Sequence, residues 1–134
     1  MTPALLALCL LTELEHDIPP LLLVSVVQAE TRGRSVVARG RGKGRLGCDV
    51  GVAQVHVPRC VKSEVRRLLN PASNLAAGAR ILRWSRVRCS ARPWWYGCHG
   101  WLYGRYNPGS IRWTRTVRRY WRLWRAAARS RTDA

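Results

Sequence analysis

Residues 19–31 read PPLLLVSVVQAET, and this stretch decides the fold. From Leu21 to Val27 it is apolar nearly all round, which is typical of a helix enclosed by other elements. The run of Val would also suit a buried strand. The two Pro residues at the start, which a first helical turn tolerates, and the polar Gln28-Ala29-Glu30 at the end favour a helix. We therefore expect a central, buried helix.

Glu30 lies at the end of the expected helix and is our candidate for a catalytic group. It stands three, four and seven residues after Val27, Val26 and Leu23, so on a helix it shares their apolar face. Partial desolvation disfavours an ionised carboxylate, which suits a general acid that must hold a proton near neutral pH. The alternative is an exposed or ion-paired Glu at a helix end, which so Arg-rich a chain could easily satisfy. Position alone leaves both interpretations open.

Further helices are predicted on both sides of the central one. Before it, residues 3–16 place four Leu on one stripe at three-residue spacing: Leu5, Leu8, Leu11 and Leu14. After it, residues 58–69 form a helix, and Asn70-Pro71 supplies a cap and a first-turn Pro for the next one. That next helix presents small and apolar side chains on one face: Leu75, Gly78, Ala79 and Leu82.

The remaining segments are a loop, an aromatic stretch and a basic helix. Residues 32–47 are rich in Gly and Arg and are expected to form a loop. Residues 92–110 are rich in Trp, Tyr and Gly, which suits either a glycan-binding cleft or core packing in a chain without Phe. Residues 111–129 place aromatic side chains on one helical face and Arg on the other. This helix could pack on the domain or lie on an anionic envelope surface, and we favour packing with charge steering.

Length and net charge limit the possible architecture and the kind of partner. A chain of 134 residues can bury one core but not two, so we expect a mainly α single domain of about five to six helices with a Gly-rich loop region. Residues 1–110 would form the catalytic part and 111–134 a basic amphipathic helix packed on it. The net charge of +17 comes from 24 basic residues against seven acidic ones and indicates a polyanionic partner.

Five Cys are many for this length, and four of them bracket two short segments. We expect disulfides between Cys48 and Cys60 and between Cys89 and Cys98, with Cys9 left over. Reduced, buried thiols are one alternative, and a zinc site using a nearby His is another. No C-x-x-C or H-x-x-x-H pair supports zinc, so we predict no metal and no cofactor.

Four motifs occur in a telling order: Glu30 at the end of the central helix, GVAQV at 51–55, NP at 70–71 followed by NLAAGA at 74–79, and YNPG at 106–109. Over roughly residues 5–110, this order and spacing resemble the soluble lytic transglycosylases and the goose-type lysozymes. In that family a Glu ends a buried helix, a G-L-M-Q-like turn follows, an N-I-x-x-G-A helix comes next, and a Y-N-x-G segment closes the site. The resemblance implies a lysozyme-like fold and an enzyme that cleaves peptidoglycan.

The resemblance also implies residue roles. Glu30 would protonate the glycosidic oxygen between N-acetylmuramic acid and N-acetylglucosamine. Gln54 would line the cleft near the sugar, Tyr106 would orient the acid, and Asn107 would support that segment. Thr31 replaces the family's usual Ser and keeps a hydroxyl. With Asp49, these form the substrate-binding set that we predict: Gln54, Tyr106, Asn107, Thr31 and Asp49.

Departures from the family favour one reaction type. Ala53 stands where the family has a bulky Met, which would open the cleft. Goose-type lysozymes carry an acidic residue two positions past the Gln, where this chain has His56. A hydrolase usually needs a second carboxylate, and Asp49 is the candidate on the same loop. A lytic transglycosylase needs Glu30 alone, first as acid and then as base on the sugar's own 6-hydroxyl. We therefore favour the anhydro-forming reaction over hydrolysis.

Two other classes remain as rivals. The Arg content and interleaved aromatics would suit a nucleic-acid-binding protein, and residues 111–131 would suit a non-catalytic, envelope-disrupting module. Neither accounts for the four ordered motifs, so we expect peptidoglycan as partner, no nucleic acid, and a monomer. The N-terminal segment lacks the positive region and the cleavage site of a signal peptide. A phage particle, a pore or a secretion machine would then deliver the enzyme to the bacterial wall or periplasm.

Overall fold

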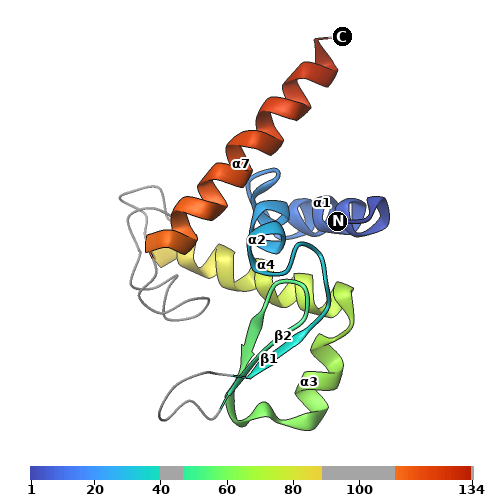
Figure 1. The fold of residues 1–134 in the computed structure, drawn as a ribbon, viewed down its shortest axis with the longest axis vertical. Helices are drawn as coiled ribbons and strands as arrows, with labels where there is room; N and C mark the ends of the chain where they lie inside the picture. Colours follow the sequence, from blue (N-terminus) through green and yellow to red (C-terminus); the bar gives the residue numbers. More distant parts are fainter. Residues whose placement is uncertain (40–46, 89–110, 134) are drawn as a thin grey trace.

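The computed structural model describes residues 1–39, 47–88 and 111–133 and is mainly helical, as predicted (Figure 1). The described α-helices are α1 (Pro3–Glu15), α2 (Leu22–Glu30), α3 (Lys62–Leu68), α4 (Pro71–Arg88) and α7 (Ile111–Thr132). A small antiparallel sheet has the order β1 (Val37–Arg39), β2 (Cys48–Val50) and β3 (Val55–Val57). A single 3-10 turn, η1 (Pro58–Cys60), joins the sheet to α3.

The predicted central helix is confirmed. Every side chain of α2 from Leu22 to Val27 is buried, and α1, α4 and α7 pack around it. Its start differs from the prediction, because Pro19 and Pro20 stand before the helix rather than in its first turn. Leu21 occupies the N-cap position with a left-handed backbone (φ +67°) and supplies no side-chain cap. The first N–H groups of α2 must therefore find their acceptor elsewhere in the fold.

The α1 helix forms as predicted, but the proposed Leu stripe is wrong as its buried face. Leu11 is 58% exposed and Leu14 is 78% exposed. The buried side chains of α1 are spaced by four, three and one residues: Leu5, Cys9, Thr12 and Glu13. A strict three-residue repeat turns through about 300° per step, so it winds around a helix of 3.6 residues per turn instead of following one side.

The sheet was not predicted, and β1 lies inside the segment predicted as a loop. In β2 and β3 the inward side chains alternate with an outward one, in the pattern Cys48-Asp49-Val50 and Val55-His56-Val57. The register pairs Cys48 with Val57, Asp49 with His56, and Val50 with Val55. The predicted Cys48–Cys60 disulfide is present, with a Cα–Cα distance of 5.3 Å, and it ties β2 to η1. The predicted Cys89–Cys98 pair lies outside the described residues.

The predicted helix over 58–69 is interrupted. Arg59 (φ +57°) and Cys60 (φ +48°) have left-handed backbones, so η1 ends there and α3 begins only at Lys62. The next prediction is confirmed, since α4 begins at Pro71 and the Asn70 side-chain oxygen accepts the Ser73 N–H at 3.1 Å. The predicted inner face of α4 is likewise buried: Leu75, Gly78, Ala79 and Leu82.

The basic C-terminal helix also forms as predicted, and its apolar face packs on the domain. Val117 is buried in the core, and the Trp121 indole Nε1 donates to the Pro20 carbonyl at 2.9 Å. Figure 1 shows α7 running past α2, with its C-terminal part projecting beyond the other elements. Among the described helices, none combines the length and the apolar character needed to cross a bilayer.

Candidate functional site

The C-terminal end of α2 carries the candidate acid and is fastened to the turn that follows β2. Glu30 is the last residue of the helix and is partly buried. The next residue, Thr31, is buried, and its hydroxyl donates to the Val52 carbonyl at 2.8 Å while accepting the Gly33 N–H at 3.2 Å. The hydrogen bond from Thr31 to Val52 therefore holds the backbone next to Glu30 in place.

The GVAQ turn at 51–54 is built from two left-handed residues and a buried amide. Gly51 has φ +79°, and a Cβ there would overlap the Asn74 side chain and approach the Leu68 carbonyl to 2.6 Å, so only Gly fits. Gln54 has φ +49°, and its Nε2 donates to the Gly51 carbonyl at 2.9 Å and to the Val36 carbonyl at 3.2 Å. These two hydrogen bonds of the Gln54 side chain thus stabilise the turn on its buried side.

Asn74 on α4 holds the same turn from the other side. Its side chain is fully buried, its Nδ2 donates to the Val50 carbonyl at 2.7 Å, and its Oδ1 accepts the Ala53 N–H at 2.8 Å. Val50 is the residue before the turn and Ala53 lies within it, so the Asn74 side chain bonds both to the start and to the middle of this segment. The NLAAGA motif therefore begins with the residue that joins α4 to the turn.

These bonds bring three of the four motifs together at the end of α2. Glu30, the GVAQ turn and Asn74 converge, and the fourth motif, with Tyr106 and Asn107, lies outside the described residues. Thr31 and Gln54, two members of the predicted substrate-binding set, are buried, and the Thr31 hydroxyl and the Gln54 Nε2 donate to backbone carbonyls. The Thr31 bond joins the end of α2 to the turn, and the Gln54 bond closes the turn.

Asp49 forms a pair that the sequence did not predict. It faces His56 across β2 and β3, and the His56 Nδ1 lies 2.9 Å from the Asp49 Oδ1. Both side chains point to the outer side of the sheet and are partly exposed. Asp49, the candidate second carboxylate, and His56, which stands where the goose-type lysozymes carry an acidic residue, therefore form one hydrogen-bonded unit.

Glu13 is a buried carboxyl with a raised pKa, and the sequence did not predict its role. Its side chain is 2% exposed and caps α2 from α1: Oε2 accepts the Leu21 N–H at 2.8 Å, and Oε1 accepts those of Leu23 at 2.7 Å and Val24 at 3.2 Å. Desolvation raises the pKa of Glu13 to about 7, although these three bonds work in the opposite direction. Burial, together with the charge of Glu13, also raises the pKa of Cys9 to about 12.

One local signal could have pointed to Glu13. The helix start after Pro19-Pro20 has no Ser, Thr, Asp or Asn at the N-cap position, so its N–H groups needed an acceptor from another segment. The helix just before it ends with Glu13 and Glu15, and only Glu13 falls on the buried side. Glu13 therefore fixes one end of α2, and Thr31 fixes the other.

No group of three or more His, Cys, Asp or Glu side chains that could hold a metal ion occurs in the described parts of the chain. Comparisons of the chain with models of protein families, with curated proteins and with solved structures found no match.

Proposed function

We propose that the protein is a peptidoglycan-cleaving enzyme with a lysozyme-like catalytic domain, and that it acts as a lytic transglycosylase with Glu30 as its acid and base. Its substrate is the glycosidic bond between N-acetylmuramic acid and N-acetylglucosamine in the bacterial wall. The chain works as a monomer and reaches the wall by a phage particle, a pore or a secretion machine.

One observation carries the proposal. The Glu30 end of α2, the GVAQ turn and the NLAAGA helix are far apart in the sequence, yet buried side-chain hydrogen bonds join them: Thr31 to Val52, and Asn74 to Val50 and Ala53. Motifs that arose by chance would have no reason to meet at one place. Their meeting beside a partly buried carboxylate supports a site built around Glu30.

The proposed reaction uses the Glu30 carboxyl twice. Protonated, it donates its proton to the glycosidic oxygen as the bond to the muramic acid C1 breaks. As a carboxylate, it then takes the proton from the 6-hydroxyl of the same sugar, whose oxygen attacks C1 and closes a 1,6-anhydro ring. Both steps take place at one carboxyl, which lies partly buried at the end of α2.

Hydrolysis is the second candidate, and it depends on Asp49. A hydrolase would use that carboxylate to activate water, as inverting enzymes use their second carboxylate. The Asp49 Oδ1 is already bonded to His56, and this engagement favours the transglycosylase reaction. An Asp49→Asn variant would remove the carboxylate that hydrolysis needs, and we expect it to leave the anhydro product unchanged.

Product analysis tests the reaction type. Purified peptidoglycan is incubated with the protein, and the soluble fragments are examined by mass spectrometry. We expect muropeptides with 1,6-anhydro ends, which are lighter than hydrolysed ones by one water. Reducing ends would instead assign hydrolysis, and the absence of any soluble fragment would overturn the proposed enzyme class.

A further inference from the structure

The α7 helix separates its apolar and its basic side chains onto opposite sides. Val117 is buried, Trp121 and Trp124 pack against the core, and the Trp121 indole is bonded to the Pro20 carbonyl. At 100° per residue, these three fall within about 60° of the helix circumference. The apolar face is therefore already occupied by the domain.

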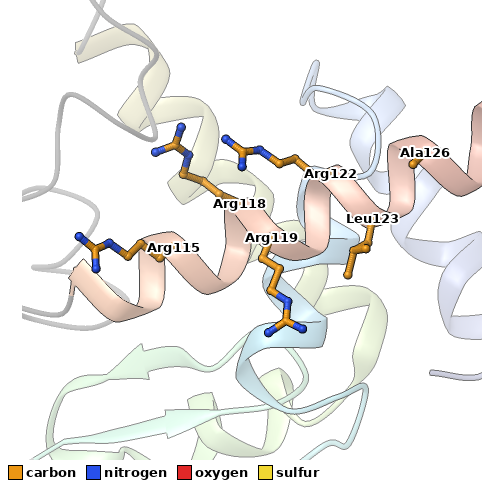
Figure 2. Close-up of a pocket in the computed structure, with 6 residues that line it drawn as sticks. All are labelled: Arg115, Arg118, Arg119, Arg122, Leu123 and Ala126. Atoms are coloured by element: carbon orange, nitrogen blue, oxygen red, sulfur yellow. The ribbon is translucent and has the colours of Figure 1, made fainter.

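The opposite side of α7 is an Arg face, which we define as Arg115, Arg118, Arg119, Arg122, Arg125 and Arg129. These positions fall within about 120° of the circumference and extend over roughly 21 Å along the axis. The helix contains no Asp or Glu. Along this face runs an open groove of about 480 Å³ lined by Arg115, Arg118, Arg119, Arg122, Leu123 and Ala126 (Figure 2).

Figure 2 also shows how the guanidinium groups are spread. Arg118 and Arg122 reach out on one side of α7, and Arg119 reaches out on the other. A second open groove of about 300 Å³ continues toward the C-terminus, where Arg125 and Arg129 line it. Arg125 is held over the Trp121 ring, with its guanidinium carbon 5.2 Å from the ring centre. The Arg face thus belongs to a helix that is packed against the domain.

We propose that the Arg face docks the protein onto an anionic phospholipid surface by binding headgroup phosphates, while the Trp side stays packed on the domain. Guanidinium groups match phosphate oxygens in geometry and keep their charge at any physiological pH. This docking is independent of the cleavage reaction proposed for Glu30.

The packing of α7 favours docking on a surface over insertion into a bilayer. An amphipathic helix that enters a bilayer must bury its own apolar face there, but that face of α7 lies against α2. Guanidinium groups spread along the outward side of α7, with no acidic side chain on the helix, suit a flat, anionic surface.

The test uses the full chain and vesicles of phosphatidylcholine with or without phosphatidylglycerol. We expect sedimentation with the anionic vesicles only, reversal of binding at about 1 M salt, and no leakage of vesicle contents. Each surface Arg strengthens binding to anionic lipid about fivefold, so the triple variant Arg115→Gln/Arg119→Gln/Arg122→Gln should bind about 100-fold more weakly. All three side chains are exposed, so the fold should be unaffected.

A matched control removes the same charge elsewhere. Arg66, Arg80 and Arg83 are also exposed, and their triple Gln variant should keep most of the binding. Equal weakening by both variants would overturn the proposal in favour of net charge. Binding that resists salt, or leakage, would overturn it in favour of insertion, and tighter binding to duplex DNA at the same salt would assign a nucleic-acid partner.

Discussion

Replacing Glu13 by Gln should reverse the order of stability between low and high pH. The folded pKa of Glu13 is about 7, against an ordinary 4.5. Since the unfolded chain gives up this proton first, folding loses stability as the pH rises from 4.5 through 7, by roughly 3 kcal/mol in all. Gln stays neutral and avoids this loss.

The substitution also has a fixed penalty. Gln can offer its one oxygen to the N–H groups of Leu23 and Val24, but its Nε2 cannot accept the Leu21 N–H that the Glu13 Oε2 accepts. Losing that bond should destabilise the fold by about 1–2 kcal/mol. The natural chain has already lost roughly 1 kcal/mol of this stability at pH 5, so the variant should be less stable there by at most about 1 kcal/mol. At about pH 8, where the loss is nearly complete, the variant should be more stable by about 1–2 kcal/mol.

Urea unfolding followed by far-ultraviolet circular dichroism at both pH values measures this. Other titrating groups occur in both proteins, so their effects cancel in the difference. Glu15→Gln is the matched control, because Glu15 is an exposed carboxyl on the same helix and should show no such crossing. A natural chain that gains stability over Glu13→Gln as the pH rises would refute the reasoning, because the three N–H bonds would then outweigh desolvation.

Three further substitutions test the contacts that hold the site and α7. Asn74→Leu removes two buried side-chain hydrogen bonds, so urea unfolding should show a loss of about 2–3 kcal/mol; a loss below about 1 kcal/mol would contradict its bridging role. Changing Cys48 and Cys60 to Ser should lower stability by about 3 kcal/mol under non-reducing conditions, and reducing agent should then have no further effect. Trp121→Phe removes the bond to Pro20 together with part of the indole packing and should lower stability by about 1–3 kcal/mol, whereas an unchanged value would argue against anchoring of α7.

The helices were predictable because their signals are local. The apolar run of α2, the Asn70-Pro71 start of α4 and the two-sided pattern of α7 all lie within a few turns of chain. The sheet was not predictable in the same way. Strands of three residues are too short to display an alternating pattern, and β1 is exposed along its whole length. Only pairing with β2 makes β1 a strand.

The candidate site, like the fold, was predictable only in part. The order of the motifs predicted that Glu30, the GVAQ turn and Asn74 belong together, and hydrogen bonds connect these segments. Sequence could not show that Gln54 and Thr31 turn inward, because burial depends on which segments pack over them. Nor could it identify Glu13, whose acceptor role arises only when α1 brings its carboxylate against the start of α2.

Release of soluble fragments from purified bacterial walls by Glu30→Gln, beside the natural chain and Glu15→Gln, tests the central claim most directly. Loss of a general acid slows such reactions by about 100-fold or more, so we predict at least that loss for Glu30→Gln, with wall binding and stability unchanged and with Glu15→Gln fully active. Release by Glu30→Gln at the natural rate would contradict the account.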